Sequence, residues 1–207
     1  MPAYEDHTEP SVSILNQQVY VSWSWDFHKP KGYTQDAREP TIFARTINND
    51  LSLGKPFNVS SHKIDSAPAL SKAHDNKLWC AWDSLGYNQK GRANRKNLYV
   101  RSLNAANTID KETAIAENLV NVCSPFFAFG RNHKGLLTWS QTKNGKDFSL
   151  WKADYDSENN CWKEAAMVIS EGNPRFGSCV YDTQGQLWLA YSAQTDKGRE
   201  IIVKRLD

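Results

Sequence analysis

Short runs of alternating apolar and polar residues recur along the whole chain, with polar turns between them. Residues 10–14 read Pro-Ser-Val-Ser-Ile, and residues 19–23 read Val-Tyr-Val-Ser-Trp. A period of two is typical of half-buried β-strands, and the β-branched and aromatic residues in these runs favour strands. No apolar period of 3.6 persists, although residues 113–118 are compatible with one helical turn. The pattern therefore predicts an all-β protein.

The alternating runs fall into four copies of one unit. The first run of each unit opens with a proline, at residues 10–14, 68–70, 125–129 and 174–180. The second run ends in an aromatic residue (Trp23, Trp82, Trp139 and Tyr191), and these residues are spaced 59, 57 and 52 apart. The third run carries a cation (Arg45, Arg101, Lys152 and Lys204), with spacings of 56, 51 and 52. Because two independent markers keep nearly the same period, the chain is an internal repeat.

A fourth run follows in the first three units, at residues 55–59, 117–122 and 161–169. Four short strands in each repeat are the signature of propeller blades. We therefore predict an all-β protein that is one β-propeller domain over residues 1–207, built from four repeats of four-stranded antiparallel blades. The predicted blades are approximately 8–60, 61–122, 123–172, and 173–207 together with 1–7.

The fourth unit ends after its third strand, so its fourth strand must come from elsewhere to protect the sheet edge. Residues 4–10 align with residues 168–174, the end of the third unit. The last blade is then closed by the N-terminus, through residues 3–6, or by another chain. Three alternatives follow: a small closed ring, a fragment of a larger propeller, or a homo-oligomer in which a second copy completes the propeller.

The fullest repeat carries Pro174, Asp182, Gly185 and a Leu-Trp-x-Ala-Tyr run, and it ends in Lys-Arg-Leu-Asp. This pattern resembles the blades of TolB-like and sialidase-like (BNR-type) propellers. The resemblance spans nearly the whole chain and implies the propeller fold, and the sialidase-like group includes enzymes that act on polysaccharides. The Asp-box of sialidases, Ser-x-Asp-x-Gly-x-x-Trp, is absent from all four repeats, which argues against sialidase activity.

The loops between second and third strands share one face of a propeller with the loops that join successive blades. Two of these loops are long, at residues 26–41 and 84–97, and long loops commonly carry function. Each pairs a Gly-Tyr with cations and amides, which suits sugar rings and their hydroxyl or carboxylate groups. The predicted ligand-binding residues on this face are Asp26, His28, Tyr33, Arg38, Asp83, Tyr87, Arg92 and Arg175.

The predicted function is lectin-like: recognition of a carbohydrate or protein ligand by a rigid propeller. Cations at Lys90, Arg92, Arg95 and Lys96 suit an anion, or are a solvated surface. Asp26 and Asp83 stand at matching places, where two carboxylates either act on a glycosidic bond or cap turns. No catalytic motif is present, so no catalytic residue is predicted. The alternatives are a glycoside hydrolase or lyase of sialidase-like type, and a structural propeller domain.

Composition narrows the partners further. The net charge of +2 predicts no nucleic-acid partner, and no apolar run approaches the ~20 residues of a membrane span. The five histidines are dispersed, so neither a metal nor a cofactor is predicted. The four cysteines are expected to be buried free thiols, with one disulfide as the alternative. No signal peptide is visible, which leaves two compartments open: the cytoplasm, or a secreted or periplasmic location with the signal removed.

Overall fold

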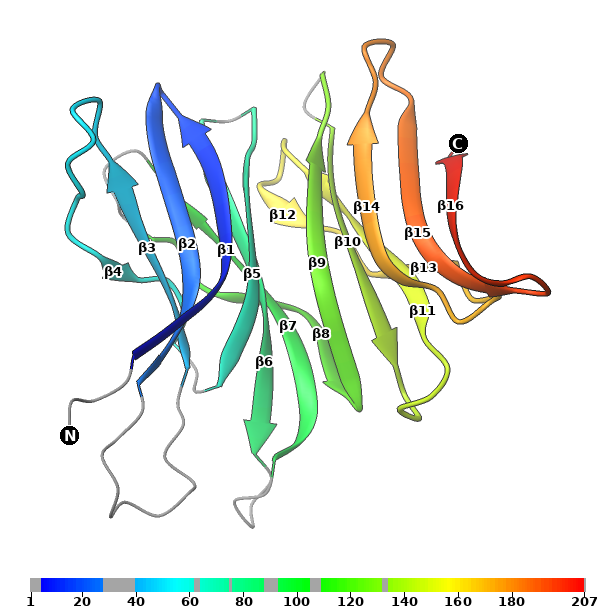
Figure 1. The fold of residues 1–207 in the computed structure, drawn as a ribbon. Coiled ribbons are helices and arrows are strands. Elements are labelled where there is room, and N and C mark those ends of the chain that lie inside the picture. Colours follow the sequence, from blue (N-terminus) through cyan, green and yellow to red (C-terminus); the bar gives the residue numbers. More distant parts are fainter. Residues whose placement is uncertain are drawn as a thin grey trace, which may run out of the picture.

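The computed structural model describes residues 5–27, 40–61, 64–74, 76–87, 93–104, 109–131 and 134–206 (Figure 1). Of these, residues 5–7, 26–27, 86–87 and 93–94 are described by their backbone alone. Every regular element among the described residues is a β-strand, and these strands form four antiparallel sheets. The predicted all-β class is confirmed.

The first two sheets each have four strands in chain order. The first contains β1 (Glu5–Leu15), β2 (Gln18–Phe27), β3 (Thr41–Ile47) and β4 (Phe57–Asn58). The second contains β5 (Asp65–Lys72), β6 (Leu78–Tyr87), β7 (Ala93–Leu103) and β8 (Thr113–Leu119). We call them blades one and two.

The third sheet, blade three, contains five strands, because its outer strand is broken into β12 and β13, which both pair with β11. Its strands are β9 (Asn121–Phe129), β10 (Gly135–Thr142), β11 (Ser149–Asp156), β12 (Cys161–Trp162) and β13 (Ala166–Ile169). Blade four has three strands: β14 (Arg175–Tyr181), β15 (Leu187–Thr195) and β16 (Gly198–Leu206).

Two predicted segments differ from the observed ones. The outer strand of blade two is Thr113–Leu119 rather than 117–122, so residues 113–118 form a strand and not a helical turn. Val122 instead belongs to β9 and is fully buried. The long loop predicted at residues 84–97 is largely an extension of the β6–β7 hairpin, in which Leu85 pairs with Lys96. In both places the backbone groups find partners in a neighbouring strand, which alternation alone does not reveal.

The innermost strand of each blade carries a β-bulge at the same place. The bulge residues have positive φ in all four blades: Glu9 at 55°, Ala67 at 52°, Ser124 at 56° and Phe176 at 56°. A proline follows in the first three blades, where a missing N–H costs no ladder bond. In blade four the next residue is Gly177, so Pro174 is not the structural counterpart of the other three prolines.

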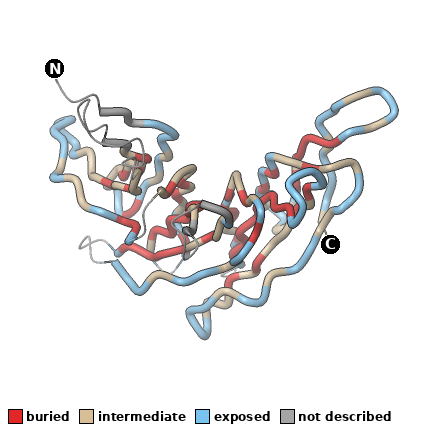
Figure 2. The backbone as a smooth tube through the Cα atoms, turned by 90° about the horizontal axis from the view of Figure 1, so that it is seen from below, coloured by how far each residue is buried: buried red, intermediate tan, exposed pale blue. Residues whose placement is uncertain are grey.

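The core consists of three apolar clusters, one between each pair of adjacent blades. Trp82 and Trp139 are 0% exposed and Tyr191 is 7% exposed, so the repeated aromatic position packs between sheets as predicted. Figure 2 shows buried residues following the middle of the molecule and exposed residues along its outer side. Fully burying a large side chain contributes about 1.5–3 kcal/mol, so these clusters hold the blades together.

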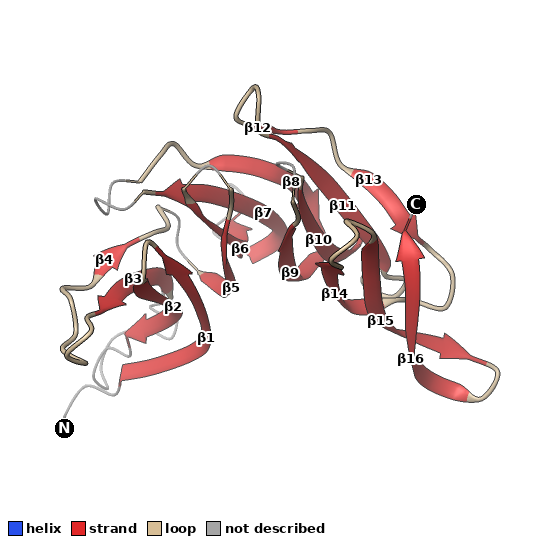
Figure 3. Ribbon diagram, turned by 90° about the horizontal axis from the view of Figure 1, so that it is seen from above, coloured by secondary structure: helices blue, strands red, loops and turns tan. Residues whose placement is uncertain are grey.

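The blades fan out along an open arc, with β1, β5, β9 and β14 on its concave side (Figure 3). Blades one and four stand at opposite ends, so β1 and β16 lie far apart (Figure 1). Closure of the last blade by the N-terminus is therefore wrong for the residues that the structure describes. Glu5 pairs with Phe27 and Asp6 with Asp26, both in blade one, because the β1–β2 hairpin is the nearest available ladder.

Asp182 organises the turn between β14 and β15. Its carboxylate accepts hydrogen bonds from the backbone N–H of Gln184 and Gln186 and from Nε1–H of Trp188, and the Trp188 bond is the main cause that lowers its pKa. A lowered pKa in the folded state adds stability at neutral pH that is lost as the pH falls through that pKa. Asp182→Ala should therefore lower the melting temperature at pH 7, and this effect should shrink as the pH falls below about 4, the ordinary pKa of an aspartate, as measured by circular dichroism. A loss that is independent of pH would contradict this role.

Candidate functional site

In each blade a pair of residues lies beside the bulge of the innermost strand, near the C-terminal end of the second strand. The residue before each bulge pairs with a residue of the second strand. These pairs are Thr8 with Ser24, Ser66 with Asp83, Cys123 with Ser140, and Arg175 with Ser192. Because the innermost strands lie next to one another along the arc, these positions form one row. Charged side chains occur in this row at Asp83 and Arg175.

Asp83 is held in a buried ion pair. Its side chain is 3% exposed, and Lys96 Nζ lies 2.5 Å from Oδ2. Ser66 donates a hydrogen bond to Oδ1. Lys96 reaches the carboxylate because β6 and β7 are adjacent strands, and its side chain remains 25% exposed. Both carboxylate oxygens of Asp83 are therefore engaged, whereas the ammonium keeps contact with solvent.

Cys123 of blade three lies between the Asp83–Lys96 ion pair of blade two and Arg175 of blade four. Burial raises the pKa of its thiol, and the negative charge of Asp83 raises it further. A hydrogen bond with Ser124 and the charges of Lys96 and Arg175 lower it. The innermost strand of blade three, which carries Cys123, lies between the strands that carry Ser66 and Arg175, so these positions are neighbours in one row.

Arg175 is oriented by an aromatic ring. Its guanidinium carbon lies 4.1 Å from the centre of the Phe148 ring, and Phe148 is 4% exposed. The backbone N–H of Phe148 is fixed by Asn173 Oδ1 at 2.9 Å. Arg175 Nε is buried without a hydrogen-bond partner among the described residues. A guanidinium stacked on a ring is pre-organised to bind planar acceptors such as carboxylates.

We call Asp83, Lys96, Cys123 and Arg175, with Phe148, the central cluster. The structure brings together two of the predicted ligand-binding residues, Asp83 and Arg175. Asp26 and Tyr87 lie at the ends of β2 and β6, and their side chains are not described. The remaining predicted residues lie outside the described residues: His28, Tyr33, Arg38 and Arg92.

Sequence reasoning did not assign Cys123 or Phe148 to the site, and it treated Lys96 as part of a loop cation cluster. The available signal for Lys96 was its place across a hairpin from Asp83. Phe148 carried no signal of its own, because it lies in the turn before β11 and contacts Arg175 of the next blade.

A second concave region lies at the opposite end of blades three and four. This cavity has a volume of about 610 Å³, and its lining includes Lys134, Lys152, Asp154, Lys163, Tyr181 and Arg205. Lys152 Nζ and Asp154 Oδ2 are 3.0 Å apart. Burial is the main cause that raises the pKa of Tyr181 to about 12. The molecule therefore presents a cationic cavity on the face opposite to the predicted one.

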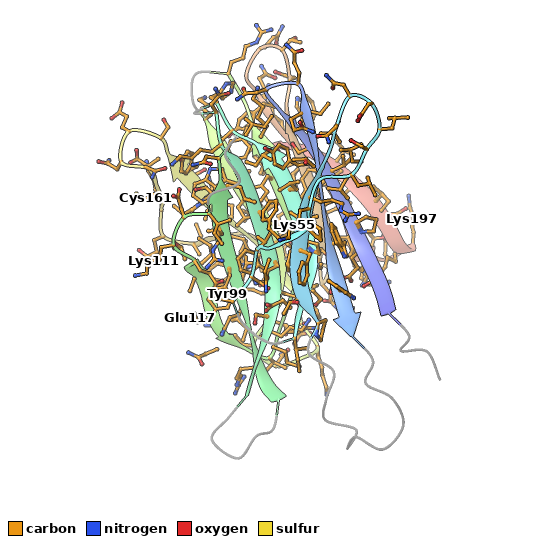
Figure 4. The ribbon with its side chains drawn as sticks, turned by 90° about the vertical axis from the view of Figure 1, so that its left-hand side faces the viewer. Lys55, Tyr99, Lys111, Glu117, Cys161 and Lys197 are labelled. Carbon is orange, nitrogen blue, oxygen red and sulfur yellow. The ribbon has the colours of Figure 1, made fainter. Side chains whose placement is uncertain are left out.

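All four cysteines are free thiols. Cys80 and Cys179 are buried, and burial is the main cause that raises their pKa values to about 12 and about 11. Cys161 is exposed at the outer edge of blade three, so the prediction of a buried thiol is wrong there (Figure 4). It lies in β12, a two-residue strand at the sheet edge, where little covers it.

Neither a metal site nor a membrane-spanning helix is found in the described part of the chain. Among those residues no three His, Cys, Asp or Glu side chains are grouped as metal ligands would be. The same residues include no helix with the length and apolar character needed to cross a membrane.

No protein-family model matches the chain, and no curated protein matches it in sequence. Solved structures do match its fold. A xylan β-1,4-xylosidase from Bacillus halodurans is 13% identical with a TM-score of 0.57, covering 97% of this chain and 41% of the xylosidase. A Hadza microbial sialidase is 9% identical with a TM-score of 0.66, covering 96% and 44%. A protein of unknown function from Dyadobacter fermentans is 13% identical with a TM-score of 0.65, covering 97% and 69%.

The chain spans less than half the length of the xylosidase and of the sialidase. At these identities the likeness concerns the fold. Together with the four antiparallel sheets, it confirms that the chain is built as a β-propeller.

Proposed function

We propose that this chain is a carbohydrate-binding propeller module that recognises a sugar bearing a carboxylate at the central cluster. The observation that carries the proposal is the shared register of adjacent innermost strands, which places Asp83, with its partner Lys96, and Arg175 on either side of Cys123 of blade three. Binding sites in repeat folds commonly combine side chains from several repeats, because each blade contributes one position to a shared surface.

The chemistry of the cluster favours an anionic ligand. The planar guanidinium of Arg175 offers parallel N–H donors that match a carboxylate, and the Phe148 ring fixes its orientation. Lys96 is 25% exposed, so its ammonium can donate to a ligand hydroxyl while it stays paired with Asp83. A uronic acid or a sialic acid carries both a carboxylate and several hydroxyls.

The similar structures support the ligand class in a general way. Two of them bear the names of enzymes that act on carbohydrates, a xylosidase and a sialidase. A shared fold does not transfer activity, so the argument depends on the cluster and its charges. The described geometry favours binding over catalysis, because Asp83 is 3% exposed and both its oxygens are engaged.

A glycoside hydrolase or lyase is the second candidate, and Asp83 is the observation that favours it. Glycoside hydrolysis commonly uses two carboxylates roughly 5–10 Å apart. Asp83 supplies one carboxylate at the site. Product analysis by mass spectrometry in the binding experiments below separates this candidate from simple recognition.

Arg175→Gln is expected to weaken binding of an acidic oligosaccharide by about 10- to 100-fold, because a charge-assisted hydrogen bond contributes about 1.5–3 kcal/mol. Titration calorimetry with oligogalacturonate and sialyllactose measures this, with xylo-oligosaccharides as neutral comparators. Arg205→Gln is the matched control, because Arg205 belongs to the same blade and lines the cavity on the opposite face.

The same titrations can exclude the proposal. If Arg205→Gln abolishes binding and Arg175→Gln does not, the site lies in the cationic cavity and the assignment is wrong. Cys123 gives an independent readout, since a bound sugar should slow its alkylation by iodoacetamide in a Cys161→Ser background. Binding without any protection of Cys123 would place the ligand elsewhere.

A further inference from the structure

The two end blades each expose an apolar sheet face. On blade one, Val12 is 63% exposed and Ile14 is 56% exposed. On blade four, Val180 is 60%, Ile201 is 73% and Val203 is 62% exposed. Figure 3 places these blades at the two ends of the arc. Contiguous apolar surface of this kind marks an interaction site.

The exposed face of blade one corresponds to the face with which blades two, three and four each pack on the preceding blade. Trp23 is the counterpart of Trp82, Trp139 and Tyr191, which face the preceding blade and are 0%, 0% and 7% exposed. Trp23 itself is only partly buried. The exposed face of blade one is therefore the face that receives a preceding blade everywhere else in the molecule.

The exposed face of blade four is the opposite half of the same contact. Trp188 is the counterpart of Tyr20, Trp79 and Leu136, which face the following blade and are 2%, 6% and 0% exposed. Trp188 is 38% exposed. The chain thus carries both halves of one blade-to-blade interface, one at each end of the arc.

We propose that a second copy of this chain docks head to tail, with the blade-four face of one copy on the blade-one face of the other. A second copy is the partner that fits, because its blade-four face complements the blade-one face of the first copy, and its blade-one face complements the blade-four face. A heterologous contact of this type closes into a ring if the rotation between copies allows it, and otherwise continues into a longer assembly. This proposal concerns assembly and does not rest on the proposed function.

The exposed face of blade one carries an apolar cavity that suits an aromatic side chain. A cavity of about 420 Å³ lies there, lined largely by apolar groups of Pro10, Val21, Trp23, Ile47 and Leu53. At the equivalent contact between blades one and two, Tyr20 packs in one cluster with Trp82. By the same register, Trp188 of a second copy would pack near Trp23, and Ile201 and Val203 would cover the adjoining surface of Val12 and Ile14.

The test is the solution mass by light scattering at two concentrations, without any glycan. The wild-type chain is expected to have at least twice the 23.5 kDa mass of one copy at the higher concentration. Ile14→Asp and Ile201→Asp should each give a monomer, because a buried unpaired carboxylate is costly in either half of the contact. Met167→Asp is the matched control, since Met167 is 55% exposed on β13 of blade three, away from both end blades.

Mixing the two monomeric variants distinguishes a head-to-tail contact from a symmetric one. The Ile14→Asp copy keeps an intact blade-four face and the Ile201→Asp copy keeps an intact blade-one face, so the mixture should form a one-to-one complex. Circular dichroism melting confirms that each variant is folded. A monomeric wild-type chain, a mass unaffected by either substitution, or a mixture without the complex would each overturn the proposal.

Discussion

Replacing Trp139 by alanine is expected to lower the free energy of unfolding by about 3–5 kcal/mol. The side chain is 0% exposed in the cluster between blades two and three. Its Nε1–H donates a hydrogen bond of 2.8 Å to Gln141 Oε1, and Gln141 is 5% exposed. The substitution therefore opens a cavity and leaves the buried Oε1 of Gln141 without the hydrogen bond from Trp139. Urea denaturation followed by circular dichroism measures the loss.

Trp23→Ala is the matched control for this prediction. Trp23 occupies the same repeat position but lies on the exposed face of blade one. In dilute protein its removal should cost clearly less than the removal of Trp139, because part of the ring is already in contact with solvent. Equal losses in the free energy of unfolding at the two positions would contradict the view that the repeated aromatic residue stabilises the fold by its burial between blades.

Arg101→Met is the second substitution with a large expected effect. Arg101 Nη2 lies 3.4 Å from Glu112 Oε2, and the two side chains are 10% and 9% exposed. Arg101 Nη1 also donates to the backbone oxygen of Val59, in blade one. Removing one member of a buried ion pair costs about 3–5 kcal/mol, because the other charge is left uncompensated. The measurement is again urea denaturation.

Lys152→Met provides the comparison on the corresponding strand of blade three, although Lys152 pairs with Thr138 and so lies one residue out of register with Arg101, whose counterpart is Ala153. Its side chain is 32% exposed and that of its partner Asp154 is 46% exposed, so the pair should contribute less than about 1 kcal/mol. The double variant Arg101→Met with Glu112→Gln should recover part of the loss of the single variant. No recovery would show that the contact of Arg101 with the Val59 carbonyl, rather than its ion pair, accounts for the loss.

The repeat was accessible from the sequence because core packing requires the same residue types in every blade. Trp82, Trp139 and Tyr191 share one register, and each is buried against the preceding blade. The proline marker was reliable in three blades and misleading at Pro174. At the bulge the backbone requires positive φ, and glycine can follow it as well as proline does, so residue identity alone did not determine the alignment.

The central cluster was only partly predictable. Asp83 and Arg175 stood out as charges next to predicted strand ends, and the structure places them at equivalent positions of the inner hairpins of blades two and four. The ion pair of Asp83 with Lys96 depends on the length of the β6–β7 hairpin, which the sequence analysis treated as a loop. The stacking of Arg175 on Phe148 depends on how blade four sits on blade three, and no local pattern records that arrangement.

The all-β class, the four repeats and the packing of the repeated aromatic position follow from the sequence alone, because alternation and periodicity are local properties of the chain. The pairing of the strand edges and the open ends of the arc became clear only from the folded arrangement of the blades. Glu5 pairs within blade one rather than beside β16, and Trp23 and Trp188 lie on uncovered faces at opposite ends. The physical reason is that a strand edge offers the same hydrogen-bonding groups to any neighbour, so the choice depends on the distance that the folded blades impose.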